Sequence, residues 1–167
     1  MTLTEKPKIQ QDLIPVLKTV SDPEIPVLSV LALGVIREAI EENGIVKIKL
    51  TPTYSGCPAM DVIADDLKKG FSEIGKKVEV ELILSPAWST EWISEEGLQK
   101  MEAYGIARPL SESNDKDVLL GEKKLVKCPQ CGSTNTHLVS QFGSTACKAL
   151  FKCDDCQEPF DYFKCLK

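Results

Sequence analysis

The sequence predicts an α+β fold: a small three-stranded mixed sheet packed with helices, followed by a small β domain of the zinc-ribbon type. Two observations predict this class. Over residues 8–105, segments with helical periodicity and short runs with strand alternation follow one another in the order α-β-β-α-β-α. The last part of the chain, residues 127–167, carries two Cys-x₂-Cys pairs among short β-rich runs. Between them, residues 106–126 contain Pro109 and a polar run, and are predicted to be a linker.

The first expected elements are a helix and a hairpin. Apolar residues recur at helical spacing over 12–20, which predicts a short amphipathic helix there. Two β-rich runs, 35–40 and 45–50, flank the dipeptide Asn43-Gly44, and both of its residues tolerate positive φ. We therefore predict a β-hairpin, and the alternation in its second strand indicates that one of its faces is buried.

A βαβ unit is expected to follow the hairpin. Residues 58–74 carry an apolar stripe at helical spacing, and Pro58 suits the first helical position, which makes Cys57 the predicted N-cap. Residues 78–84 alternate between apolar and acidic side chains and predict a third strand. Because a helix connects them, this strand should lie parallel to the strand before the helix. A last helix is predicted over 94–105.

The C-terminal tail is too small to fold unaided. Its strands are expected over 134–142, 148–152 and 159–164, and its remaining apolar residues are mainly aromatic. Below about 40–70 residues, the gain from burial and the loss of conformational entropy roughly cancel, so such a module needs a further stabilising link. Structural zinc supplies an apparent 10–16 kcal/mol, roughly, in small peptides at neutral pH. We therefore expect that a metal ion decides whether the tail folds.

Four cysteines of the tail have the spacing of a zinc site: Cys128, Cys131, Cys153 and Cys156. Each Cys-x₂-Cys pair can supply two thiolates, and four thiolates can surround one ion with metal–sulfur bonds of about 2.3 Å. The two pairs are 21 residues apart, at the edge of the usual spacing of roughly 15–20. The alternative, four unrelated buried cysteines, has to explain two separate x₂ spacings. We therefore predict a structural zinc ion here.

Three other residues of the tail leave alternatives open. Cys147 and Cys165 lack this spacing; either could replace a ligand, or the tail could hold an iron–sulfur cluster, which also takes four thiolates. His137, the only histidine, is either a further zinc ligand or, as we expect, a hydrogen-bonded side chain on a strand. A single histidine also means that this chain alone cannot form a ferritin-like di-iron centre or a facial-triad iron site, which need two.

In the first domain, Cys57 is the candidate for chemistry. A thiol at a helix N-terminus meets unpaired N–H groups, which should lower its pKa and favour the thiolate, a nucleophile or metal ligand. The alternative is a small buried hydrophobe. Because the domain has no second cysteine, a metal or cluster there needs ligands from a second subunit, another protein or the tail. Asp22 and Glu24 could line such a site, although an Asp-Pro-Glu run is more often a solvated turn.

Composition and charge limit the class of protein. A chain of 167 residues with 43% hydrophobic and 27% charged residues is typical of one soluble domain plus a small module. No apolar run approaches the roughly 18–20 residues of a membrane span, and no secretory signal is apparent, so we expect a cytoplasmic protein with reduced cysteines. The net charge is −5, and the segment from Glu122 onward has seven lysines against five acidic residues. We therefore expect neither a membrane nor a nucleic acid as partner.

Motifs in both parts of the chain carry a resemblance to a known family. They are Val20-Ser-Asp22-Pro23-Glu24, Leu33-Gly34-Val35, Thr51-x₄-Gly56-Cys57-Pro58 and Pro86-Ala-Trp88 in the first part, and Cys128-Pro-x-Cys131-Gly-Ser, Phe142-Gly-Ser-Thr-Ala-Cys147 and Cys153-x₂-Cys156-x₂-Pro159-Phe160 in the tail. The first part resembles the SufT-like iron–sulfur assembly domain. The combination closely resembles the PaaD (PaaJ) family, small subunits encoded with the phenylacetyl-CoA epoxidase. The resemblance covers nearly the whole chain.

The resemblance implies an accessory subunit, rather than an enzyme, in aerobic phenylacetate degradation. Such a subunit would assist the assembly or maintenance of an iron–sulfur or di-iron centre, and its partners would be the oxygenase or reductase subunits of the epoxidase. The characteristic cysteine of the family corresponds to Cys57 and its acidic turn to Asp22 and Glu24, which implies transient binding of iron or an iron–sulfur cluster there. Because each chain would offer only one thiol for this task, a homodimer is a further expectation.

Two other functions remain open from the sequence. The chain could be a structural or electron-transfer subunit of the epoxidase, with an iron–sulfur cluster in its tail. It could also be a zinc-ribbon protein that binds nucleic acid, although its charge argues against this function.

Overall fold

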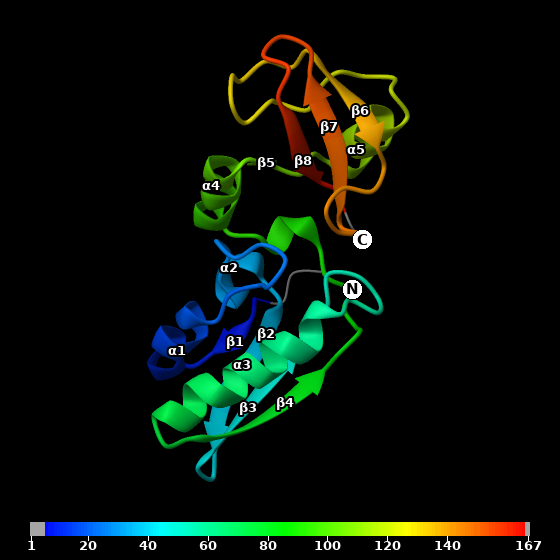
Figure 1. Ribbon diagram of the computed structural model, residues 1–167. Helices are drawn as coiled ribbons and strands as arrows, with labels where there is room; N and C mark the ends of the chain where they lie inside the picture. Colours follow the sequence, from blue (N-terminus) through cyan, green and yellow to red (C-terminus); the bar gives the residue numbers. More distant parts are fainter. Residues whose placement is uncertain (1–5, 166–167) are drawn as a thin grey trace. The chain divides into compact units, whose positions relative to one another are not determined.

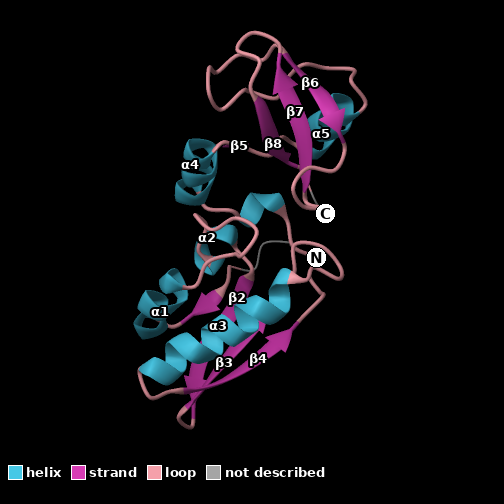
Figure 2. Ribbon diagram, viewed as in Figure 1, coloured by secondary structure: helices cyan, strands magenta, loops and turns pink. Residues whose placement is uncertain are grey.

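The computed structural model describes residues 6–165 of the chain, which forms two compact units (Figure 1). The first ends at Gly97 and the second begins at Leu98. Each unit contains one four-stranded sheet, and helices and strands occur in both units (Figure 2). The predicted α+β class, with a β ribbon at the C-terminus, is confirmed. None of the helices in the described part of the chain is long and apolar enough to cross a membrane.

The sheet of the first unit is mixed, as predicted, but has one strand more than expected. Its order is β1-β2-β3-β4, with β2 and β3 antiparallel and the two outer pairs parallel. The strands are β1 (Lys8–Ile9), β2 (Ile36–Glu42), β3 (Ile45–Leu50) and β4 (Lys77–Leu82). Strand β1 has only two residues, too few for an alternation that could be seen in the sequence. The predicted hairpin turn is confirmed, since Asn43 and Gly44 have φ values of 53° and 77°.

Helix α3 (Ala59–Glu73) covers one face of this sheet (Figure 1). Its predicted stripe is buried: Ile63, Leu67 and Phe71 are each fully inaccessible to solvent. The opposite face carries ion pairs, such as that of Lys49 with Glu38 at 2.9 Å. This division explains why β3 alternates strictly, because its apolar residues meet the helix and its lysines meet water. The other helices of the unit are η1 (Gln11–Leu13), α1 (Ile14–Thr19), α2 (Val30–Leu33) and η2 (Thr90–Trp92).

Helix α4 (Glu95–Tyr104) is the element along which the chain passes from the first unit to the second. It begins where the sequence predicts, because the Oγ atom of Ser94 accepts a hydrogen bond from the N–H of Gly97 at 3.0 Å. This is the usual side-chain cap of a helix start. The predicted helix over 94–105 is therefore confirmed.

The sheet of the second unit has the order β5-β8-β7-β6. Its elements are β5 (Ile106–Ala107), α5 (Glu112–Leu119), β6 (Thr136–Ser140), β7 (Lys148–Cys153) and β8 (Pro159–Phe163). The three predicted strands of the tail are present, and β7 pairs with antiparallel neighbours on both sides. Strand β5 is parallel to β8.

The segment 106–126 differs from the predicted linker, because it belongs to the second unit. It contains β5 and α5, and it contributes Ala107, Val118 and Val126 to the core. Helix α5 is also fixed by a polar contact, since the buried carboxylate of Asp115 accepts a hydrogen bond of 2.5 Å from the hydroxyl of Tyr162. The polar run at the start of α5 conceals these contacts in the sequence, because little of the helix is apolar.

Candidate metal centre and cysteine site

The four cysteines predicted to bind metal come together in the second unit. The Sγ atoms of Cys128, Cys131, Cys153 and Cys156 all lie within 4.8 Å of one another. The distance is 3.7 Å between Cys128 and Cys156, and 3.6 Å between Cys131 and Cys153. Four sulfurs placed tetrahedrally at about 2.3 Å from one ion would be about 3.8 Å apart. The donor set therefore fits a tetrahedral ion, and four thiolates suit either zinc or iron.

Two tight turns present these sulfurs. In the first turn, the N–H of Gly132 donates to the carbonyl of Cys128 at 2.9 Å, and Gly132 has the positive φ of 76° that such a turn requires. In the second turn, between β7 and β8, the N–H of Cys153 donates to the carbonyl of Glu158 at 2.9 Å. Each turn fixes one Cys-x₂-Cys pair, and the fold of the sheet brings the pairs face to face.

The crowding of four thiols affects their acidity. The backbone N–H groups of Cys156 and Asp155 stabilise the Cys153 thiolate, which lowers the pKa of Cys153 to about 7. For Cys156, the N–H of Glu158 acts in the same direction, but burial and the neighbouring thiols outweigh it and raise the pKa of Cys156 to about 12. One proton thus leaves easily and another only with difficulty. A bound cation would remove this conflict, because it stabilises all four thiolates together.

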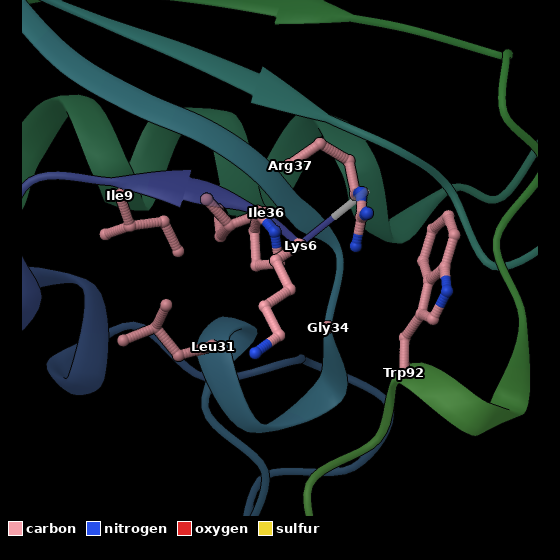
Figure 3. A pocket seen from close by; sticks show the side chains of 8 residues that line it. Lys6, Ile9, Leu31, Gly34, Ile36, Arg37 and Trp92 are labelled. Atoms are coloured by element: carbon pink, nitrogen blue, oxygen red, sulfur yellow. The ribbon is translucent and has the colours of Figure 1, made fainter. Parts of the chain in front are cut away.

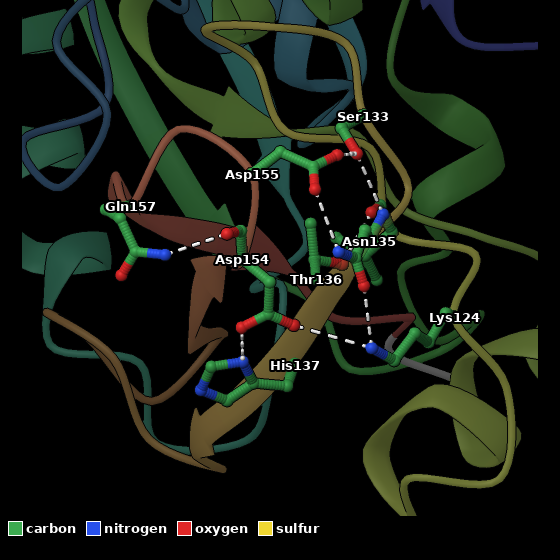
Figure 4. Close-up of polar contacts among 9 residues, drawn as sticks. Lys124, Ser133, Asn135, Thr136, His137, Asp154, Asp155 and Gln157 are labelled. Atoms are coloured by element: carbon green, nitrogen blue, oxygen red, sulfur yellow. Dashed lines mark hydrogen bonds and ion pairs between the residues drawn. The ribbon is translucent and has the colours of Figure 1, made fainter.

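Polar side chains link the two turns that carry the cysteines (Figure 4). The carboxylate of Asp155, within the second turn, accepts hydrogen bonds from the hydroxyl of Ser133 and from Nδ2 of Asn135, the latter at 2.9 Å. The N–H of Asp154 donates to the carbonyl of Asn135 at 2.8 Å. These contacts hold the two turns together without using a sulfur atom. We call Ser133, Asn135 and Asp155 the turn latch.

The only histidine is part of this polar surface and is not among the four clustered donors. Nδ1 of His137, on β6, lies 2.8 Å from Oδ1 of Asp154, and Nζ of Lys124 lies 3.4 Å from Oδ2 of the same carboxylate (Figure 4). The prediction of a hydrogen-bonded strand histidine is therefore confirmed. Its carboxylate partner follows Cys153 directly, so the pair supports the second turn from outside.

Cys147 and Cys165 also lie outside the cluster of four sulfurs. Cys147 is buried just before β7, where its carbonyl accepts a hydrogen bond from the N–H of Lys164 at 3.0 Å. The N–H of Cys165 donates to Oδ1 of Asp115 at 2.9 Å. The contacts of both residues thus fasten the end of the chain to the ribbon.

In the first unit, Cys57 lies in the loop between β3 and α3, and its side chain is buried with 8% exposure. The position differs from the predicted N-cap by one residue. Pro58 occupies the N-cap position, with φ −71° and ψ −16°, and the helix begins at Ala59. Cys57 is therefore placed just before the helix, where the N–H of Cys57 donates to the carbonyl of Tyr54 at 3.2 Å.

The prediction that the helix start lowers the pKa of Cys57 is wrong in direction. Burial of the thiol is the largest effect and raises its pKa; the N–H of Ala59 and the hydroxyls of Thr53 and Tyr54 oppose it only in part. The sequence missed the roles of Thr53 and Tyr54. The only signal available was that these two hydroxyl side chains lie four and three residues before the cysteine in the same loop. At neutral pH the buried group is a thiol, and its sulfur would ionise on binding a metal ion.

The acidic turn predicted for this site is close to Cys57 in the fold. The negative charge of Glu24 contributes to the raised pKa of Cys57, although the two residues are far apart in the sequence. Asp22 is 5% exposed, and its Oδ1 accepts hydrogen bonds from the N–H groups of Glu24 at 2.8 Å and Ile25 at 2.9 Å. Asp22 thus shapes the turn that carries Glu24, so it is not the solvated side chain of an ordinary turn. The charge of the Glu24 carboxylate thus acts on the Cys57 sulfur through space.

Comparison with known proteins agrees with this division. The model of the "Iron-sulfur cluster assembly protein" family matches residues 10–82, and that of the "PaaD zinc beta ribbon domain" matches residues 112–164. The chain is 42% identical to an Escherichia coli (strain K12) protein that is provisionally named as one of the subunits of 1,2-phenylacetyl-CoA epoxidase; the match covers 90% of this chain and 89% of that protein. This chain belongs to the PaaD family. The predicted family is therefore confirmed.

Two further relatives each match about half of this PaaD-family chain. A Porphyromonas gingivalis protein named "Fe-S protein maturation auxiliary factor" is 34% identical, with 55% of this chain and 90% of that protein covered. A Bacillus subtilis (strain 168) protein of the same description, YitW, is 29% identical, with 52% of this chain and 86% of that protein covered.

Proposed function

We propose that this chain is an accessory factor, and not itself an enzyme, that assists assembly or maintenance of an iron–sulfur or di-iron centre in the phenylacetyl-CoA epoxidase system. The observation that carries the proposal is that the charge of Glu24 acts on the buried thiol of Cys57, in a unit that matches the iron–sulfur assembly family. The names of the relatives support both the epoxidase system and the assembly role. One relative is named as an epoxidase subunit, and two are named as iron–sulfur maturation factors. Its working place would be the cytoplasm, where thiols stay reduced.

Incomplete coordination suits transfer of iron. Cys57 offers one sulfur and Glu24 a carboxylate, whereas an iron–sulfur cluster or an iron ion held stably takes more ligands. The cargo would therefore be shared with ligands of the recipient subunit, or with Cys57 of a second copy of this chain, and released when those ligands take over. Asp22 would act by holding the turn that positions Glu24.

In the second unit, we assign zinc to the four-cysteine site as a structural ion. The sulfur separations fit a closed tetrahedral site without an open position, which is typical of structural zinc. The ribbon would then provide a rigid surface that docks on the oxygenase or reductase subunits of the epoxidase.

The test is the variant Cys57→Ser in a strain that needs phenylacetate as its carbon source and lacks its own copy of the gene. We expect lost growth, an unchanged circular dichroism spectrum, and an epoxidase complex that purifies with reduced iron content. Cys165→Ser, which alters a half-buried thiol of the other unit, is the matched control and should support growth. Normal growth and full iron content in the Cys57→Ser strain would refute the proposal.

The alternative is an electron-transfer subunit with an iron–sulfur cluster at the four cysteines, since four thiolates also suit such clusters. Metal and sulfide analysis of protein purified with and without oxygen separates the two functions. One zinc ion, with neither iron nor sulfide under both conditions, excludes the alternative. Iron with equimolar sulfide in the anaerobic preparation would replace our assignment of zinc.

A further inference from the structure

The two edges of the sheet in the first unit differ in how much backbone they offer to another strand. Strand β1, at one edge, has only two residues and follows Pro7, which has no N–H group to donate. Beside it, Leu31 and Trp92 line a cavity at the start of β2, where the guanidinium carbon of Arg37 lies 3.7 Å from the centroid of the Trp92 ring (Figure 3). So short an edge strand is a poor template for pairing.

Strand β4, at the other edge, is six residues long and regular (Figure 1). It contains no proline, and its parallel pairing with β3 runs through without a bulge. The N–H of Ile83, just after the strand, donates to the carbonyl of Leu50 at 2.8 Å. Because backbone groups point alternately to the two sides of a strand, Val78, Val80 and Leu82 turn theirs away from β3, where no strand of the described residues pairs with them.

The apolar side chains of β4 are only partly covered. Val78 and Val80 are half-buried and Leu82 is 53% exposed, whereas the residues directly opposite them on β3 are buried. Leu84, just beyond the strand, is 64% exposed. A row of partly exposed apolar side chains next to an open strand edge is a place where a further strand can pair and bury apolar surface at the same time.

The other face of β4 carries two acidic side chains that determine which strand would fit. Glu79 and Glu81 are exposed and lie opposite Lys47 and Lys49 of β3. Both lysines form ion pairs on their other side, with carboxylates of β2 at 2.8 Å and 2.9 Å. From β2 to β4 the charges therefore alternate as negative, positive and negative. Neither acid of β4 forms an ion pair within residues 6–165, so cations on a further strand would continue the series.

We propose that β4 binds an extended segment of a partner protein as a fifth strand of the sheet, and that apolar residues alternate with lysine or arginine in this segment. Its backbone would bond to the outward groups of β4, its apolar side chains would extend the row that ends at Leu82, and its cations would pair with Glu79 and Glu81. A second copy of this chain fits less well. Two β4 strands paired along their whole length would set acidic side chains opposite each other, which destabilises a sheet.

The position of β4 connects this edge with the Cys57 site. Cys57 follows β3, and β4 is parallel to β3, so Cys57 and the carboxyl end of β4 lie at the same end of the sheet. An added strand would thus bring the partner to the end of the sheet where the thiol lies. The identity of the partner as the subunit that receives iron rests on the proposed function, whereas the binding of a strand to β4 does not.

The test uses the ¹⁵N-labelled full-length chain and two short peptides with blocked ends. In the probe peptide valine alternates with lysine, and in the matched control peptide valine alternates with glutamate. We expect the lysine peptide to shift the amide signals of β4 saturably and to slow hydrogen exchange of the N–H groups of Val78, Val80 and Leu82, because an added strand would occupy them. The glutamate peptide should bind about fivefold or more weakly, since like charges across a strand pair repel.

Variants separate the backbone contacts from the charges. Val80→Pro removes one outward N–H group, at a position where an edge strand tolerates proline, and should weaken binding of the lysine peptide about tenfold. If Val80→Pro loses its dispersed amide spectrum, the double variant Glu79→Gln with Glu81→Gln takes its place and should no longer prefer the lysine peptide. Glu73→Gln, which changes an exposed acid of α3, is the matched control and should keep the preference.

The outcomes distinguish strand binding from iron handling. Cys57→Ser should bind the lysine peptide like the natural chain, so a failure of the proposed function would leave this result intact. Equal affinity for the two peptides, unchanged hydrogen exchange in β4, or full binding by a folded Val80→Pro chain would overturn the proposal. A chain that sediments as a dimer and becomes a monomer in Val80→Pro would also overturn it, because the edge would then belong to a second copy.

Discussion

The two units place their chemistry differently relative to their cores. In the first unit, a sheet and helix α3 bury a large set of aliphatic residues, and Cys57 lies in a loop at the edge of that core. In the second unit, two of the clustered cysteines, Cys128 and Cys153, are themselves core residues beside Phe151 and Tyr162. A small domain has too little apolar surface to separate its stabilising groups from its metal site. Under our proposal the first unit would therefore offer a thiol for exchange, whereas the second would need its thiols for folding.

The largest expected effect follows from removing the proposed metal ligand Cys153, which is fully buried. Cys153→Ser, or treatment with a strong chelator, should unfold the second unit while the first stays folded, because the metal contributes on the order of 10 kcal/mol to such modules. Amide NMR spectra would show loss of dispersed signals from β6 to β8 only. If the ribbon signals persist without metal, packing alone holds this unit, and the contrast between the two units fails.

Removing a core side chain, instead of a cysteine, tests what stabilises the first unit. Phe71→Ala on α3 removes a fully buried ring and should cost about 3–5 kcal/mol of the free energy of unfolding, with the metal content unchanged. Urea unfolding followed by tryptophan fluorescence measures it, since both tryptophans belong to this unit. Val62→Ala on the same helix is the control: Val62 is 46% exposed, so the change should cost below about 0.5 kcal/mol. Equal losses in the two variants would show that this core is not the source of stability.

Breaking the turn latch should have a smaller effect, on the metal affinity of the second unit. Asp155→Ala removes the acceptor of the hydrogen bonds from Ser133 and Asn135, and should weaken metal binding about tenfold or more, as is typical for residues that support metal ligands. Competition with a coloured zinc chelator measures the affinity. Glu158→Gln, which changes an exposed side chain near the same turn, should have little effect. Unchanged affinity in Asp155→Ala would mean that the sulfurs are positioned by the backbone alone.

The smallest effect concerns the reactivity of Cys57. Because burial raises its pKa, alkylation by iodoacetamide should be slower at neutral pH than for a free thiol, and should accelerate as the pH rises above the ordinary thiol pKa. The protonated form is the one favoured by the fold, so its contribution to stability is present below the ordinary pKa and is lost as the pH rises above it. Glu24→Gln should shift the alkylation profile to lower pH, measured by peptide mass spectrometry. Ser55→Ala, which changes an exposed side chain of the loop that carries Cys57, is the control and should leave the profile unchanged. A Glu24→Gln profile identical to that of this control would place Glu24 too far away to act.

Much of the candidate chemistry could be predicted from the sequence because it depends on local spacing. Cys128 and Cys131 meet because only two residues of a turn separate them, and the same holds for Cys153 and Cys156. The stripe of α3 and the Asn43-Gly44 turn are equally local. The segment 106–126 looks like a linker in the sequence although it contributes to the core, because its core residues are single apolar side chains scattered through a polar run. Periodicity detects a buried face only where several neighbours share it.

The sequence by itself determined the longer helices and strands, the two pairs of thiols and the family. Only the tertiary structure decided the environment of Cys57, since its pKa depends on burial and on Glu24, which the fold brings near. Tertiary structure likewise decided that the two Cys-x₂-Cys turns face one another at a distance suited to one ion, and that Arg37 stacks on Trp92. The physical reason is common to all three. Desolvation and Coulomb interactions act through space, so they are set by neighbours distant in sequence, whereas turns and helices are set by neighbours along it.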